Sequence, residues 1–373
     1  MHATAWLLSL SLTLPRRAAV LALSTGVPAL QSASARPAIS ATANVPARFS
    51  FELSSVDVGG ASVPLAIWTP GGAAGRPETY PYAVDVGKIA AKLRVGWLSW
   101  LPRFDKPLPC GAAPWAGLPS GFDSSAKSGD AIVFAHGFLG SPYDMAHICE
   151  ALAADGFTVA APELPESLTA SYREPEGGLA REEIISAARE TVGGALRWGI
   201  FGHSAGAGSA LRQRGSYALG RCALAGGYRG FDGPDPIFLI ASDGDGCNRF
   251  ASYPLQTILA AESDNGIAAT TMFASAAAAY ERPSGGRMPL RGAYIFSEAA
   301  AGGAPLPCHI SFLWSASNEA LIALLAPLLP VAQALGLFVL DFDVYMANRD
   351  SEATAEQVAP AVRRFFLSAS QRR

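Results

Sequence analysis

Short apolar runs alternate with amphipathic stretches through the middle of the chain, and this pattern predicts strands and helices in turn. Ala131–Ala135, Phe157–Ala161 and Ile237–Ser242 have the length and apolar character of buried strands. Tyr143–Asp155 and Glu182–Trp198 carry apolar residues at helical spacing. Strands that alternate with helices indicate an α/β fold, with a mostly parallel central sheet and helices on both faces.

Two further strands and a covering segment are predicted before this alternating region. Phe51–Val58 and Ser62–Thr69 read as strands separated by Gly59-Gly60. Residues 70–129 are rich in Gly, Pro, Trp and Ser, which predicts an irregular segment over the core. Residues 49–370 are expected to form a single domain.

One late stretch, Ala320–Leu340, is apolar except for Gln333 and is long enough to span a membrane. Pro327, Pro330 and Gly336 interrupt it, so a core or lid helix followed by a strand is the preferred interpretation. A helix lying in a lipid interface is the alternative, and with it a peripheral contact with a membrane. A true span is the least favoured.

Composition narrows the class of protein. Half of the 373 residues are hydrophobic and 16% are charged, which favours a folded chain with a sizeable core. The net charge of −3 offers no basic surface for nucleic acid, so no such partner is expected. The five cysteines form no CxxC or His/Cys ligand pattern, so we predict no metal site.

The first 48 residues differ from the rest. They contain no Asp or Glu, many Ala and Ser, and four arginines: Arg16, Arg17, Arg36 and Arg48. Such a composition is typical of a transit peptide, so residues 1–48 are predicted to be a removable targeting segment. A plastid destination is preferred, and secretion is the alternative.

The chemistry centres on Gly202-His203-Ser204-Ala205-Gly206. A Gly-x-Ser-x-Gly motif between a strand and a helix forms a nucleophile elbow, in which a sharp turn exposes the serine hydroxyl. A predicted strand, Gly199–Gly202, precedes the serine here, and a helical stretch, Ser209–Arg214, follows it. Ser204 is therefore the predicted nucleophile.

A second motif, His136-Gly137-Phe138, follows the buried strand Ala131–Ala135 directly. Backbone N–H groups in such a turn, together with that of the residue after the nucleophile, stabilise the negative oxygen of a tetrahedral intermediate. The predicted oxyanion donors are the N–H groups of Phe138 and Ala205. No catalytic role is assigned to the His136 side chain.

The general base follows by elimination. In this arrangement the chain order is serine, acid, histidine, and four of the five histidines precede Ser204. Only His309 follows it, after the strand-like stretch Gly292–Ser297. His309 is therefore predicted to take the Ser204 proton.

Several aspartates compete for the acid. The apolar run Ile237–Ser242 ends in Asp243-Gly244-Asp245, and Asp245, deeper in the turn, is preferred. Asp232 and Asp243 remain the alternates. If the triad assembles, Cys247 and Cys308 flank its acid and base and could lie within disulfide reach, although two thiols are the preferred interpretation.

These motifs resemble the chlorophyllase and platelet-activating-factor acetylhydrolase-like branch of the α/β hydrolases. Val133–Gly140 with Gly156–Pro162 is similar to that family's oxyanion strand, helix and next strand. Gly202–Gly206 is similar to its elbow, and His309–Phe312 to its histidine loop. The place where relatives often carry the acid reads Ala223-Leu-Ala-Gly-Gly227 here, without a carboxylate.

The resemblance implies an α/β-hydrolase fold over residues 49–370 and a serine carboxylic-ester hydrolase without a cofactor. The expected substrate is a large hydrophobic ester, either a pigment or a lipid. Chlorophyll, cleaved to chlorophyllide and phytol, is the first choice, and a phospholipid or acylglycerol is the alternative. A hydrolase fold that binds without catalysis is the minor alternative.

Overall fold

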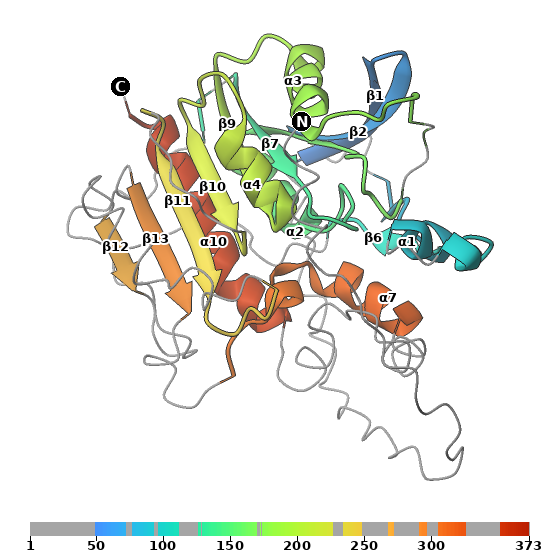
Figure 1. The fold of residues 1–373 in the computed structure, drawn as a ribbon. Helices are drawn as coiled ribbons and strands as arrows, with labels where there is room; N and C mark the ends of the chain where they lie inside the picture. Colours follow the sequence, from blue (N-terminus) through green and yellow to red (C-terminus); the bar gives the residue numbers. More distant parts are fainter. Residues whose placement is uncertain are drawn as a thin grey trace. The chain divides into compact units, whose positions relative to one another are not determined.

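A twisted sheet of nine strands forms the centre of the part of the chain that is described (Figure 1). The structure is a computed structural model, and it describes residues 49–71, 77–92, 96–111, 126–127, 129–169, 172, 174–226, 234–247, 268–271, 291–296, 305–325 and 351–372. All of these lie in one compact unit, Val45–Arg373.

The sheet has the strand order β1-β2-β8-β7-β9-β10-β11-β13-β12. The seven strands from β8 to β12 in this order run parallel, while β1 and β2 are antiparallel. The strand bounds are β1 Phe49–Val58, β2 Ala61–Pro70, β7 Asp130–Ala135, β8 Thr158–Pro162, β9 Arg197–His203, β10 Gly220–Leu224, β11 Ile237–Ser242, β12 Ala268–Thr271 and β13 Arg291–Phe296.

Helices cover both faces of the sheet, because alternate side chains of each central strand enter opposite cores. On β9, Phe201 points toward α2 (Ala146–Ala154) and α10 (Ser351–Ser370), and its ring stacks on Phe134 of β7 at 4.8 Å. Its neighbour Ile200 points to the other face, where α3 (Arg181–Val192) and α4 (Ala205–Arg212) pack. Figure 1 shows α4 in front of the strands and α10 behind them. The predicted α/β fold with a mostly parallel sheet is therefore confirmed.

A buried ion pair joins the two helices on the α10 face. The Arg363 guanidinium of α10 donates two hydrogen bonds of 2.7 Å to the carboxylate of Asp155, the residue that caps the C-terminus of α2. Both side chains are almost fully buried. Removing one partner of such a pair typically costs about 3–5 kcal/mol, so this contact fixes α10 against α2.

Two predicted helix boundaries are wrong. The helix predicted over Glu182–Trp198 ends at Val192, because Gly193 and Gly194 adopt positive φ angles, and Trp198 lies in β9. The helix predicted from Ser209 begins at Ala205, immediately after the elbow. The first four residues of this helix, Ala205-Gly206-Ala207-Gly208, are small, so the apolar pattern does not reveal where the helix begins.

The covering segment is less irregular than predicted. Two short ladders form within it, β3 (Thr79–Tyr80) with β6 (Leu108–Pro109) and β4 (Ala83–Asp85) with β5 (Arg103–Asp105). Helix α1 (Val86–Lys92) and a 3₁₀ turn, η1 (Gly96–Leu98), lie between β4 and β5.

Part of the apolar stretch Ala320–Leu340 is described. Helix α7 (Ser315–Leu325) contains its first residues, and residues 326–350 lie outside the described part, including the predicted strand before α10. Among the described helices, none combines the length and apolar character needed to cross a bilayer. The leader over residues 1–48 also lies outside the described residues, so that boundary stays a prediction.

Candidate active site

Ser204 occupies a sharp turn between β9 and α4. Its φ of 57° and ψ of −120° are unusual for a residue other than glycine. The turn also needs both flanking glycines, because a Cβ at Gly202 would overlap the backbone of Gly206, and one at Gly206 would overlap the backbone of Ala135. The Ser204 N–H donates to the Leu224 carbonyl at 2.9 Å, which ties the turn to β10.

Three side chains form a continuous hydrogen-bonded chain at this turn. The Ser204 Oγ lies 2.9 Å from His309 Nε2, and His309 Nδ1 lies 3.0 Å from each carboxylate oxygen of Asp245. The Asp245 side chain is fully buried and that of His309 is 9% exposed. The loops that follow β9, β11 and β13 thus bring a hydroxyl, a carboxylate and an imidazole together at the carboxyl edge of the sheet.

The histidine loop is held by several backbone contacts. His309 begins a 3₁₀ turn, η2 (His309–Phe312), which Cys308 and Ser311 close by a reciprocal capping box. Ser242 Oγ donates to the Pro307 carbonyl at 2.6 Å, and Asn318 Nδ2 donates to the Ile310 carbonyl at 2.9 Å. The position of the imidazole is therefore fixed from both sides of the loop.

Of the three candidate acids, the structure brings Asp245 to the histidine. Its carboxylate also accepts the N–H of Cys247 at 3.0 Å, so the loop wraps around the acid. Asp243, two residues earlier, is exposed at the start of the same turn. Asp232 lies outside the described residues.

The turn after β7 approaches the serine closely. A Cβ at Gly137 would lie 3.1 Å from Ser204 Cβ, so this turn and the elbow are in contact. Neither the Phe138 N–H nor the Ala205 N–H has a hydrogen-bond partner among the described residues. Two backbone donors beside one hydroxyl are the arrangement that stabilises an oxyanion.

The His136 side chain holds the turn after β7 in place through two hydrogen bonds. Its Nδ1 donates to the Gly137 carbonyl at 2.8 Å, because its Nε2 accepts the N–H of Leu164 at 2.8 Å and carries no proton. Burial, more than the nearby Arg181 charge, lowers the pKa of His136 to about 3, so the ring stays neutral. Arg181 in turn donates to the His136 carbonyl and to Glu166.

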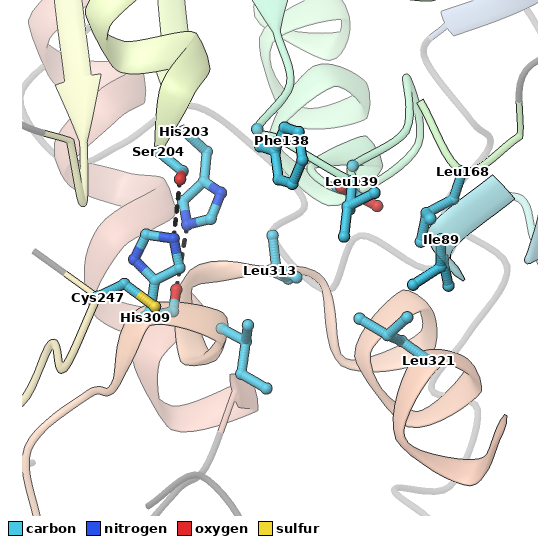
Figure 2. A pocket seen from close by; sticks show the side chains of 14 residues that line it. Ile89, Phe138, Leu139, Leu168, His203, Ser204, Cys247, His309, Leu313 and Leu321 are labelled. Carbon is cyan, nitrogen blue, oxygen red and sulfur yellow. Dashed lines mark hydrogen bonds between the residues drawn. The ribbon is translucent and has the colours of Figure 1, made fainter. Parts of the chain in front are cut away.

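An apolar cavity of about 190 Å³ opens in front of the serine (Figure 2). Leu313 and Leu321 form one side of it, and Ile89 and Leu168 close the far end, while Phe138 stands beside His203 and Ser204. The remaining lining residues are Gly137, Leu139, Gly140, Asp144, His203, Ser204, Cys247, His309 and Ile310. The lining favours an apolar group next to a reactive polar centre.

Two cysteines border the site. Cys247 lines the cavity and Cys308 is buried, and both are thiols with no disulfide between them. Ligand atoms of Asp245, Cys247 and His309 lie within 4.8 Å of one another, a spacing at which side chains could hold a metal ion. Two of these three residues are already joined by the hydrogen bonds between acid and base, so the cluster has an explanation without an ion.

Sequence reasoning missed two residues that shape the site. His203 Nε2 donates to the His309 carbonyl at 3.1 Å (Figure 2), a contact between positions 106 residues apart that no local pattern reveals. Asp144 lies buried in the cavity wall and accepts hydrogen bonds from the N–H and Oγ of Ser141, at 2.9 and 3.0 Å. For Asp144, the signal available in the sequence was a charged residue near the start of the predicted helix Tyr143–Asp155.

The strand order, with the elbow between β9 and α4 and the histidine after β13, is that of the α/β-hydrolase fold. No family model matches the chain, and no curated protein matches it. The chain is similar to an α/β serine hydrolase without a lid from Xanthomonas campestris, at 13% identity over 71% of this chain and 87% of that chain, with a TM-score of 0.37.

Two other solved structures extend this likeness. A ferulic acid esterase from Streptomyces cinnamoneus is 19% identical over 60% of this chain and 71% of that chain, with a TM-score of 0.30. An acylaminoacyl peptidase from Pyrococcus horikoshii is 13% identical over 67% of this chain and 37% of that chain, with a TM-score of 0.35. These TM-scores are low, so no substrate or activity is carried over from these proteins.

Proposed function

We propose that this protein is a serine carboxylic-ester hydrolase that acts on a hydrophobic ester. The observation that carries the proposal is the hydrogen-bonded chain from Ser204 Oγ through His309 to the buried Asp245. The serine hydroxyl lies beside the backbone N–H groups of Phe138 and Ala205, and an apolar cavity opens in front of it. This combination supplies a nucleophile, a base and an oxyanion site together.

Each step uses groups already in position. His309 Nε2 takes the Ser204 proton as Oγ attacks the ester carbonyl, and the Phe138 and Ala205 N–H groups stabilise the resulting oxyanion. The protonated His309 then gives its proton to the leaving alkoxide, which leaves an acyl-enzyme. Water that gives a proton to His309 attacks the acyl-enzyme, and His309 returns that proton to Ser204 Oγ as the acyl–Oγ bond breaks and the acid is released. Asp245 holds the Nδ1–H throughout and stabilises the positive charge on the ring.

The cavity supports the hydrophobic substrate class. Its lining is mostly apolar, and the one carboxyl group among its lining residues, that of Asp144, is engaged with Ser141. An alkyl or acyl chain entering there loses contact with water, at about 25 cal/mol per Å² of apolar surface. Chlorophyll, whose phytyl ester has a long aliphatic alcohol, is the first substrate we propose.

A phospholipid or acylglycerol ester is the second candidate. Exposed aromatic side chains near the cavity, on the segment between β4 and β5, favour a substrate that is presented at a lipid surface. The two candidates differ in which side of the ester carries the long chain, so product analysis separates them.

The experiment compares purified wild-type protein with Ser204→Ala on chlorophyll and on a short-chain phospholipid. Chlorophyllide from the wild type and none from the variant would establish the first candidate, and release of fatty acid alone would establish the second. A fluorophosphonate probe that fails to label Ser204 in folded protein would contradict catalysis altogether and favour a binding role.

The destination of the protein is a separate proposal. The acid-poor composition of residues 1–48 supports import into a plastid, with secretion as the alternative. Fusion of these residues to a fluorescent protein tests it, because plastid and secretory fluorescence are distinguished directly by microscopy.

A further inference from the structure

Residues 86–106, from the start of α1 to the residue after β5, expose three large aromatic side chains. Trp97 is 67% exposed, Trp100 is 74% exposed and Phe104 is 42% exposed, all within eight positions. Single exposed apolar residues are ordinary, but a group of large aromatic side chains marks a contact site. Trp is the residue that prefers the boundary between water and lipid, since its ring is apolar and its N–H is polar.

The segment is also basic, although the chain as a whole carries a net negative charge. Residues 86–106 contain five bases, Lys88, Lys92, Arg94, Arg103 and Lys106, and one acid, Asp105, which gives a local charge of +4. The whole chain has a net charge of −3. Basic residues interleaved with tryptophans are complementary to a surface of anionic headgroups over an apolar interior.

Backbone contacts tie the described parts of this segment to the core. The β4–β5 ladder pairs Ala83 with Asp105 and Val84 with Phe104, and both Ala83 and Val84 are fully buried. The turn after η1 packs directly on α1, where a Cβ at Gly87 would overlap the carbonyl of Ser99. The aromatic side chains are therefore presented on a platform, residues 86–106, whose described parts pack on one another and on the core.

The same platform forms a wall of the cavity in front of Ser204. Ile89 of α1 lines the cavity together with Leu168. The Asp85 N–H donates to the Leu168 carbonyl at 3.3 Å, and Arg103 Nη1 donates to the Thr169 carbonyl at 3.3 Å. Figure 2 shows Ile89 and Leu168 facing Leu321 across the end of the cavity away from Ser204.

We infer that Trp97, Trp100 and Phe104, with the surrounding bases, dock this protein on an anionic lipid surface so that the cavity of Ser204 opens toward the lipid. The inference deepens the proposed function, since an enzyme for hydrophobic esters gains from meeting its substrate in the lipid phase. Docking itself requires no catalysis, so it is measured independently of ester hydrolysis.

The test is flotation of the full chain carrying Ser204→Ala with vesicles of phosphatidylcholine alone and of phosphatidylcholine mixed with phosphatidylglycerol. We expect binding to the mixed vesicles and weaker binding to phosphatidylcholine. Trp97→Ser with Trp100→Ser should lower the affinity about tenfold or more. Lys106→Gln should lower it about fivefold on anionic vesicles and leave binding to neutral vesicles unaltered.

The matched control is Leu53→Ser, which removes an apolar side chain that is 54% exposed on the edge strand β1. Its binding should equal that of the parent protein. Equal losses from Leu53→Ser and from the tryptophan pair, no binding to either vesicle, or self-association in place of binding would each overturn the inference.

A water-soluble short-chain ester separates this inference from the proposed function. In protein that keeps Ser204 but carries Trp97→Ser with Trp100→Ser, hydrolysis of the soluble ester should equal that of the wild type. Hydrolysis of an ester with the same acyl group, packed in anionic vesicles, should fall below the wild-type rate. Loss of both would show that the platform supports the fold rather than lipid docking. Absence of soluble-ester hydrolysis in the wild type would count against the esterase proposal alone.

Discussion

The imidazole of His203 donates to the backbone carbonyl of His309 at 3.1 Å, so the residue that precedes the proposed nucleophile holds the loop of the proposed base. The two rings are tilted against each other with centroids 4.9 Å apart. Burial, and then the nearby His309, lowers the pKa of His203 to about 3, which keeps it a neutral donor even when His309 is protonated in the proposed mechanism.

Replacement of His203 should therefore weaken catalysis without altering the chemistry. His203→Phe removes the hydrogen bond to the buried His309 carbonyl, and losing such a bond typically costs about 1–3 kcal/mol. We expect kcat on a soluble ester to fall about tenfold or more with little effect on KM, since the imidazole of His309 loses its alignment. His203→Gln, which can still donate, should recover part of the loss. Full activity in His203→Phe would contradict this positioning role.

The acid can be assigned by comparing conservative variants. Asp245→Asn keeps the size of the side chain but presents an amide to His309 Nδ1, which favours the wrong tautomer of the imidazole. We expect kcat to fall about 10³–10⁴-fold. Asp243→Asn and Asp232→Asn should stay within about twofold of the wild type, because Asp245 already holds His309 Nδ1 with both carboxylate oxygens. A loss in Asp243→Asn as large as that in Asp245→Asn would contradict the assignment.

The local order of motifs was enough to predict the nucleophile and the base as candidates. Gly202 and Gly206 flank Ser204 within one turn, and His309 is the only histidine downstream, so neither inference needed a long-range contact. The parallel sheet followed from apolar runs that are buried on both faces. These features are local, and hydrophobic patterning records them directly.

The rest depended on contacts between distant positions. Asp243 and Asp245 differ by two residues, and only the turn after β11 decides which carboxylate faces His309. The order β8-β7-β9 places an earlier strand between two later ones, which no periodicity specifies. Asp144 reaches the cavity wall from the loop between β7 and α2, and Ile89 reaches it from the covering segment that also carries Trp97 and Trp100.

Cys247 should make the enzyme sensitive to thiol reagents. It lines the cavity with Ser204 and His309 and is partly exposed, whereas Cys149, Cys222 and Cys308 are buried. A maleimide adduct on Cys247 would fill space needed by the substrate, so we expect treatment to abolish ester hydrolysis in the wild type.

The control for this prediction uses Cys110, the other partly exposed cysteine, which does not line the cavity. Activity that Cys247→Ala retains should resist the reagent, and Cys110→Ala should be inactivated as the wild type is. Peptide mapping of the adduct by mass spectrometry checks the site. Inactivation of Cys247→Ala at the wild-type rate would place the sensitive thiol elsewhere.

Asp144 should make stability depend on pH between about 4 and 7. Burial raises the pKa of its carboxyl from 3.8 to about 7, despite the two hydrogen bonds from Ser141. The unfolded chain loses this proton near pH 3.8 and the folded chain near pH 7, so the native state binds more protons in between. The contribution of Asp144 to the free energy of unfolding therefore falls as pH rises through this window and is constant above it.

Asp144→Asn should remove this dependence. The amide oxygen can accept the Ser141 N–H and the amide nitrogen can donate to Ser141 Oγ, so both contacts survive without a buried charge. Thermal unfolding from pH 4 to 8 should show the stability of the variant increasing relative to that of the wild type as pH rises, with the largest difference above pH 7. Asp105→Asn, whose parent side chain is 77% exposed, serves as the control and should follow the wild type throughout. A constant difference between Asp144→Asn and the wild type at every pH would show that Asp144 does not titrate in this range.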